Sequence, residues 1–257
     1  MGEIISIHSF RGGTGKSNLA ANLSYLLAKQ GSRVGIVDTD IQSPGVHVLF
    51  GFDETRMTKS LNDFLWGRAP IEDIAYSVSE VGQADASRSY LAGLNLWLIP
   101  SSIRTNEIAR ILREGYDVNL LNQGFHTLIK KLELDYLIID THPGLNEETL
   151  LSIAISNTLV VILRPDQQDF QGTAVTVDIA RKLEVPKLRL VVNKALPRFD
   201  FASMRANIQQ TYGADVSGIL PLSEDVVFNA SNHIFSALNA SHAWTRTVTE
   251  IAHDIIS

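Results

Sequence analysis

The chain has 257 residues, of which 45% are hydrophobic and 19% charged, and its formal net charge at pH 7 is −6. Chains of this size and composition commonly form one soluble α/β domain, so we expect a single domain over residues 1–257. The sequence has no cysteine, which excludes disulfides, cysteine-ligated iron–sulfur clusters and thiol catalysis. It opens without the pattern of a signal peptide, and no apolar run approaches the roughly 20 residues of a membrane helix. We therefore expect a cytoplasmic protein, without the overall basic excess that would indicate nucleic acid.

The most informative stretch is residues 10–17, Phe-Arg-Gly-Gly-Thr-Gly-Lys-Ser. It lies between an apolar run at 3–9, expected to be a strand, and residues 18–30, expected to be a helix. A glycine-rich turn of this kind, ending in Gly-Lys-Ser, is typical of a phosphate-binding loop. The glycines let backbone N–H groups approach the phosphates, and the helix dipole attracts anions. We expect Lys16 to reach the β- and γ-phosphates and the Ser17 hydroxyl to bind Mg²⁺. The rest of the cradle is formed by Gly12, Gly13, Thr14 and Gly15.

Two acidic residues lie at the carboxyl end of the next expected strand, at 33–38. Asp38 and Asp40 alternate, so both side chains can point to one face. The carboxyl ends of parallel strands form the edge at which α/β sheets bind ligands. Carboxylates there either hold Mg²⁺ through water or orient an attacking water. The alternatives are a solvated turn, or Asp40 as the N-cap of a helix.

The middle of the chain alternates short helices and strands. Helices are expected at 44–51, 58–66, 103–113 and 119–132, and strands at 94–99 and 135–140. Residues 77–90 are polar and small, which predicts a surface loop. The run at 135–140 is almost continuously apolar, as in a buried parallel strand, and ends in Asp140. Thr-His-Pro-Gly follows at 141–144, where we expect His142 to be an exposed loop residue.

The late part of the chain distinguishes adenine from guanine. Strands are expected at 158–163, 187–192 and 216–220, and helices at 147–156, 169–183, 199–212 and 241–256. The strand at 187–192 leads into Asn193-Lys194-Ala195-Leu196. Related GTPases carry an aspartate at the fourth position of this motif, which accepts hydrogen bonds from guanine. A leucine cannot accept them, so adenine is favoured. Taken by itself, Asn193 is only a cap on the strand end.

In their order along the chain, these segments resemble the ParA/MinD family of ATPases with a deviant Walker A loop, KGGxGK[ST]. Arg11 stands at the place of the family's signature lysine. The resemblance implies a single α/β P-loop domain with a mostly parallel sheet and helices on both faces. It implies nucleotide contacts from the phosphate-binding loop, Asn193 and Pro221. It also implies a Mg²⁺ site in which Ser17 binds the ion and Asp38 and Asp140 hold its waters. The residues implied to act in catalysis are Lys16, Asp40, which positions the attacking water, and Arg11, which reaches the phosphates of a partner subunit.

The implied function is a Mg²⁺-dependent ATPase switch, slow and stimulated by a partner. ATP would join two copies into a sandwich dimer that positions a plasmid, a chromosome or a protein assembly through a cargo adaptor. The alternatives are an ATP-dependent dimeric scaffold or regulator with little hydrolysis, and a metabolic synthetase of the same class. The last expected helix has no lysine, so a basic membrane anchor of the MinD type is not expected. Seven basic residues lie between positions 181 and 205. They either bind DNA non-specifically or form only a solvated surface. The seven residues are Arg181, Lys182, Lys187, Arg189, Lys194, Arg198 and Arg205.

Overall fold

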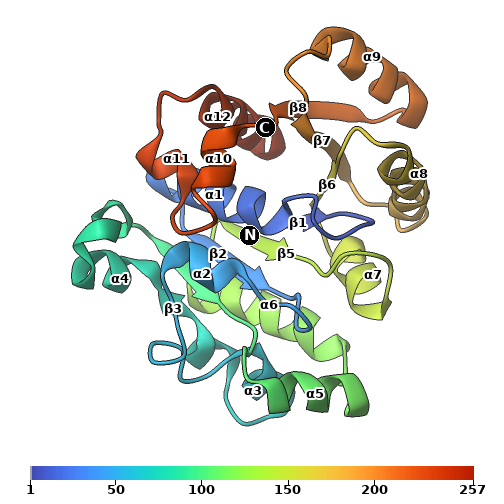
Figure 1. Ribbon diagram of the computed structural model, residues 1–257. Coiled ribbons are helices and arrows are strands. Elements are labelled where there is room, and N and C mark those ends of the chain that lie inside the picture. The colour runs from blue at the N-terminus through green and yellow to red at the C-terminus, as the bar shows by residue number, and fades with distance from the viewer. Residues whose placement is uncertain (1) are drawn as a thin grey trace.

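One β-sheet positions every other element of the protein (Figure 1). The structure is a computed structural model and describes residues 2–257. In this part of the chain eight strands form one sheet in the order β3-β4-β2-β5-β1-β6-β7-β8. All neighbouring strands are parallel except β3 and β4. The strands are β1 (Glu3–His8), β2 (Val34–Asp38), β3 (Tyr76–Ser77), β4 (Leu96–Ile99), β5 (Tyr136–Asp140), β6 (Thr158–Leu163), β7 (Lys187–Ala195) and β8 (Asp215–Pro221).

Helices cover both faces of this sheet, which confirms the expected fold class. One face is packed by α1, α2, α4 and α12, and the other by α3, α6, α8 and α9. Within residues 2–257, no helix combines the length and the apolar character needed to cross a membrane. The helices are α1 (Lys16–Lys29), α2 (Val46–Phe50), α3 (Leu61–Leu65), α4 (Val78–Ala84), α5 (Thr105–Glu114), α6 (Asn119–Lys131), α7 (Glu147–Ala154), α8 (Gln167–Lys182), α9 (Phe201–Tyr212), α10 (Glu224–Phe228), α11 (Phe235–Leu238) and α12 (Ala243–Ile256), with 3₁₀ turns η1 (Ile71–Ile74) and η2 (Ala86–Leu91).

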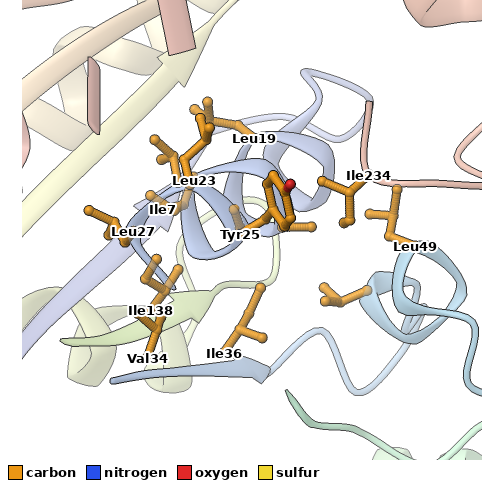
Figure 2. Close-up of a cluster of buried hydrophobic side chains, with 14 of the residues drawn as sticks. Ile7, Leu19, Leu23, Tyr25, Leu27, Val34, Ile36, Leu49, Ile138 and Ile234 are labelled. Carbon is orange, nitrogen blue, oxygen red and sulfur yellow. The ribbon is translucent and has the colours of Figure 1, made fainter. Parts of the chain in front are cut away.

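Helix α1 lies at the centre of the hydrophobic core on the face of the sheet that α1, α2, α4 and α12 cover. Leu19, Leu23 and Leu27 lie one turn apart on the side that meets the sheet, and all three are buried (Figure 2). Tyr25 leaves the helix on another side, toward Ile234. Residues 19–28 are in fact all buried, so the helix is enclosed and not merely amphipathic. Full burial of each leucine contributes about 1.5–3 kcal/mol. The loop that precedes α1 is therefore attached to one of the most firmly packed elements of the fold.

The strand register brings the expected acidic residues together. Strand β5 lies between β1 and β2, and Asp38 pairs with Asp140 across β2 and β5. Asp140 is also paired with Ile7 of β1, directly before the phosphate-binding loop. Strand pairing therefore gathers the loop and both carboxylates at one edge of the sheet, although more than 100 residues separate Asp38 from Asp140.

The expectation of a surface loop at 77–90 is wrong. The segment contains the end of β3, helix α4 and most of η2, and Val78 and Val81 are buried in the core. Its small residues serve close packing. A Cβ at Gly82 would lie 2.3 Å from the backbone nitrogen of Ala92, so glycine is required where α4 meets the chain after η2. Small residues indicated a loop in the sequence, whereas here they allow two backbones to touch.

Candidate functional site

A cavity of about 460 Å³ opens at the carboxyl edge of the sheet. It brings together the start of α1 and the ends of β7 and β8, which are far apart in the sequence. The sequence-predicted residues that line it are Gly12, Gly13, Gly15, Lys16, Ser17, Asp40, Asn193 and Pro221. The predicted residues Arg11, Thr14, Asp38 and Asp140 are not part of its lining. Thr14, Asp38 and Asp140 lie buried, each at most 1% exposed.

The backbone of the loop is shaped to receive an anion. Gly13 and Gly15 have φ of +76° and +99°, a left-handed conformation that is strained for other residues. Gly15 is the N-cap of α1 and no side chain caps the helix. The first N–H groups of α1 therefore remain free to bind an anionic ligand, which the helix dipole also attracts.

Two residues near the carboxyl end of β7, Asn193 and Lys194, hold this loop from behind. Asn193 Nδ2 donates to the Thr14 carbonyl at 2.7 Å, and Lys194 Nζ donates to the Gly13 carbonyl at 2.8 Å. Asn193 Oδ1 accepts from the Lys194 backbone nitrogen at 2.9 Å. A Cβ at Gly15 would lie 2.5 Å from Asn193 Nδ2, so glycine is needed for this contact as well as for its φ. Asn193 thus braces the phosphate-binding loop, a role that the sequence did not indicate.

Asp140 has the character expected of a magnesium-binding carboxylate. It is 1% exposed, and neither of its carboxylate oxygens has a hydrogen-bond partner within residues 2–257. Burial raises its pKa to about 6, although the Lys16 charge and the neighbouring Ser17 hydroxyl oppose the rise. Uncompensated buried oxygens are rare and indicate a missing partner. A carboxylate beside a serine hydroxyl is a donor set that suits Mg²⁺, so these residues fit the ion.

Asp38 differs from Asp140 because its oxygens already have partners. Oδ2 accepts from the backbone nitrogens of Gly45 and Val46 at 2.9 and 3.1 Å, and Oδ1 accepts from that of Asp40 at 3.1 Å. Burial, and then the charge of Asp140, raise the pKa of Asp38 well above its usual range. Asp38 therefore anchors the segment from 40 to 46, and its expected role in holding Mg²⁺ stays a prediction.

The Asp40 carboxylate is held by His142, which the sequence predicted to be an exposed loop residue. Its Oδ1 accepts from His142 Nδ1 at 2.7 Å, and from the backbone nitrogen and hydroxyl of Ser43, both at 3.1 Å. The His142 side chain is only 21% exposed, so the expectation of an exposed loop residue is wrong. The available signal was that His142 follows the acidic end of β5, which lies beside β2. Using that signal required knowledge of the strand order.

Arg11 turns toward the start of α8 in its own chain. Its guanidinium lies 3.4 Å from Asp169 Oδ1 and 3.7 Å from Asp166 Oδ1, and the side chain is 40% exposed. Arg164 also binds Asp169, at 2.9 Å from Nε to Oδ2. The preceding Phe10 fits against Gly172 of α8, where a Cβ would lie 2.2 Å from the ring. Arg11 thus lies outside the cavity, within an ionic cluster at the surface.

Two ionisable groups behind the site, the buried His8 and the partly buried Glu148, were not identified from the sequence. Burial, assisted by the charge of Lys16, lowers the pKa of His8 to about 3, and His8 Nδ1 lies 2.8 Å from Thr141 Oγ1. Burial raises the pKa of Glu148 to about 7, and Glu148 accepts a hydrogen bond from the Tyr116 hydroxyl. Neither carries a local motif, since a histidine within a strand and a glutamate in the first turn of a helix are commonplace.

The basic residues between 181 and 205 do not form one free face. Arg189 pairs with Asp254 at 3.0 Å and with Asp215 at 3.2 Å. Arg181 binds the carbonyls of Tyr212 and Gly213, Arg205 binds that of Val216, and Lys194 binds the phosphate-binding loop. Most of the charge in this cluster is engaged with its own chain.

Comparisons with known proteins agree on the family. A family model described as "ParA: NUBPL iron-transfer P-loop NTPase" matches residues 1–256. An uncharacterized ATP-binding protein of Methanocaldococcus jannaschii is 27% identical over 221 residues, which are 86% of this chain and 75% of that protein. An iron–sulfur cluster carrier protein of Pseudomonas fragi is 28% identical over 245 residues, 90% of this chain and 76% of that protein.

Among solved structures, the septum site-determining protein MinD of Pyrococcus horikoshii OT3, complexed with Mg-ADP, superposes with a TM-score of 0.80. It is 20% identical, and the match covers 99% of this chain and 96% of that one. At this identity the likeness shows the fold alone. The family model, however, spans nearly the whole sequence, and the phosphate-binding loop and strand ends lie where a P-loop site requires them. The chain therefore belongs to the ParA family of P-loop NTPases.

Proposed function

We propose that this chain is a Mg²⁺-dependent ATP-binding and hydrolysing switch. The observation that carries the proposal is the pairing of an uncapped helix N-terminus with the buried, unpartnered carboxylate of Asp140. The first attracts phosphates and the second requires a cation, so a Mg²⁺–nucleotide complex satisfies both. The far wall of the cavity includes Pro221, Leu222 and Val226, an apolar surface suited to a purine ring. Leu196 removes the acceptor that guanine would need, which favours ATP.

The residues divide the work of phosphoryl transfer to water. Lys16 and the loop N–H groups stabilise negative charge on the β- and γ-phosphates. Ser17 and Asp140 hold Mg²⁺, which neutralises phosphate charge when bound. Asp40 lines the cavity and accepts a hydrogen bond from the attacking water, which orients it. The products are ADP and phosphate.

Hydrolysis is tested by steady-state ATP turnover of the wild type against Asp40→Ala. A clear loss in the variant supports the ATPase. Equal, background-level rates with intact ATP binding would instead favour the dimeric scaffold that hardly turns over.

We further propose that ATP joins two copies and that Arg11 then reaches the partner's phosphates. Both of its contacts are long, at 3.7 Å to Asp166 and 3.4 Å to Asp169, and the exposed pair with Asp166 contributes only about 0–1 kcal/mol. Asp169 is buried, but it keeps its shorter contact with Arg164 when Arg11 leaves. Arg11 can therefore leave them at little cost. Arginine supplied from a partner is an established way to stabilise charge during phosphoryl transfer.

The dimer is tested by measuring molecular size with ADP, with ATP, and with ATP plus Arg11→Ala. We expect a dimer only for the wild type with ATP. Arg164→Ala is the matched control. It removes the other arginine that contacts Asp169 but keeps the charge of Arg11 on the phosphate-binding loop. A wild type that stays monomeric with ATP would disprove the sandwich arrangement.

For the biological role we propose positioning of a cargo, a plasmid, chromosome or protein assembly, through an adaptor that stimulates hydrolysis. Several relatives are named iron–sulfur cluster carriers, but the 257 residues of this chain contain no cysteine thiolate to hold a cluster. Reconstitution with iron and sulfide distinguishes the two roles. We expect no visible absorption from a bound cluster, and a stable chromophore would contradict the cargo proposal.

DNA is a secondary candidate for the cargo, since Lys182 and Arg198 remain in the basic cluster. Binding measured over a range of salt concentrations tests it, because phosphate neutralisation weakens steeply with salt. Salt-independent or absent binding would leave a protein adaptor as the partner.

A further inference from the structure

The contact between His142 and Asp40 joins two strand ends beside the cavity. Asp40 follows β2, and His142 follows β5, the neighbouring strand. Thr39 binds the Asp140 carbonyl through its backbone nitrogen at 3.0 Å and its hydroxyl at 3.1 Å, so the two ends are joined just before the pair. The Asp40 side chain is 14% exposed and that of His142 is 21% exposed. The pair therefore lies in a fixed and largely buried setting.

Within residues 2–257, all three hydrogen bonds that the Asp40 carboxylate accepts fall on the same oxygen. His142 and Ser43 donate to Oδ1, with His142 at the shortest distance, 2.7 Å. An ionised carboxylate only accepts hydrogen bonds, so His142 Nδ1 carries the proton of this contact. With Oδ1 occupied in this way, Oδ2 is the oxygen left for a water molecule. The hydrogen bond from His142 also restricts rotation of the carboxylate plane.

The loop itself does not depend on the His142 side chain. The backbone nitrogens of Thr141 and Gly144 donate to the carbonyls of Ile7 and Ser9, at 3.2 and 3.0 Å. The backbone of Asp40 is held separately by Asp38. Removing the imidazole should therefore loosen the Asp40 carboxylate, which keeps only its contacts with Ser43, while leaving both loops in place.

We propose that His142 is a positioning residue that fixes the Asp40 carboxylate for the attacking water, a role that rests on the proposed ATPase function. Small errors in the orientation of a reacting group are known to reduce rates by about 100-fold, and loss of an orienting partner by about 10- to 100-fold. His142→Ala should therefore lower kcat for ATP by about 10- to 100-fold and leave KM unchanged.

The experiment measures ATP turnover and ADP affinity of the full chain and of five variants, which include His142→Ala and Asp40→Ala. His142→Asn restores a donor near the position of Nδ1 and should recover most of the rate. The double variant His142→Ala/Asp40→Ala should be no slower than Asp40→Ala alone, because the two residues act as one unit. His126→Ala, which removes an exposed histidine on α6, is the control and should match the wild type. Unchanged ADP affinity shows that each variant is folded.

Each outcome bears on one proposal. If Asp40→Ala lowers turnover but His142→Ala does not, or if His142→Ala raises KM at unchanged kcat, the positioning role is overturned and the ATPase stands. If His142→Asn is as slow as His142→Ala, or if the double variant is slower than Asp40→Ala, the imidazole acts in some other way. If the wild type is no faster than Asp40→Ala, the ATPase proposal fails and the positioning role fails with it.

Discussion

Replacing Asp140 by asparagine should change how the stability of the nucleotide-free protein depends on pH. The carboxylate is buried with both oxygens unpartnered, and its pKa is raised from 3.8 to about 6. Because the folded state holds this proton more tightly than the unfolded chain, the associated stability is fully present below pH 3.8. It is lost as the pH rises to about 6.

The size of the loss follows from the shift. About two pKa units at 1.36 kcal/mol each correspond to about 3 kcal/mol. Asp38 increases this figure, because the charge of Asp140 also raises the pKa of Asp38. An asparagine does not titrate. Whatever its own desolvation costs, that cost is the same at every pH and cancels when the slopes are compared.

The assay is urea unfolding between pH 4 and 7.5, without nucleotide and then with Mg²⁺ and ADP. Relative to the wild type, Asp140→Asn should gain about 3 kcal/mol across this range and should lose most of the stabilisation by Mg²⁺–ADP. Asp178→Asn, at an exposed position of α8, should follow the wild type throughout. Parallel curves for Asp140→Asn and the wild type would refute the account of a strained carboxylate that awaits a cation.

Two further substitutions test the surroundings of the site. Glu148→Gln should flatten the decrease in stability between about pH 4.5 and 7, worth about 3 kcal/mol, because burial raises the pKa of Glu148 to about 7. Glu147→Gln, at the exposed neighbouring position, is the control, and its unfolding free energy should depend on pH as in the wild type. The same dependence on pH in both variants would contradict the prediction. Gly15→Ala and Gly31→Ala both place a side chain at φ near +100°, but only at Gly15 would the Cβ meet Asn193. We expect both variants to lose about 1–2 kcal/mol of unfolding free energy. Only Gly15→Ala should lose ADP binding in titration calorimetry. Equal losses of binding in the two variants would exclude the clash with Asn193 as the cause.

Local pattern was sufficient for much of the fold and for the phosphate-binding loop. The apolar run that ends in Asp140 was recognisable as a buried parallel strand, and the helix expected at 18–30 is α1. Glycines before Lys16 and Ser17 indicated a phosphate cradle. These features depend on neighbours within a few residues. The rule that parallel strands place their carboxyl ends at one edge then predicted that the loop and the acidic strand ends lie together.

Contacts that depend on strand order were decided only by the tertiary structure. Asn193 braces Thr14 from 179 residues away, His142 holds Asp40 from 102 residues away, and Arg11 meets Asp169 from 158 residues away. The helix α4 within 77–90 belongs to the same class, since close packing against the chain after η2 required its small residues. Periodicity tells which face of a strand or helix is buried. It does not tell which strand lies beside which, and the partners of Arg11, His142 and Asn193 follow from that arrangement.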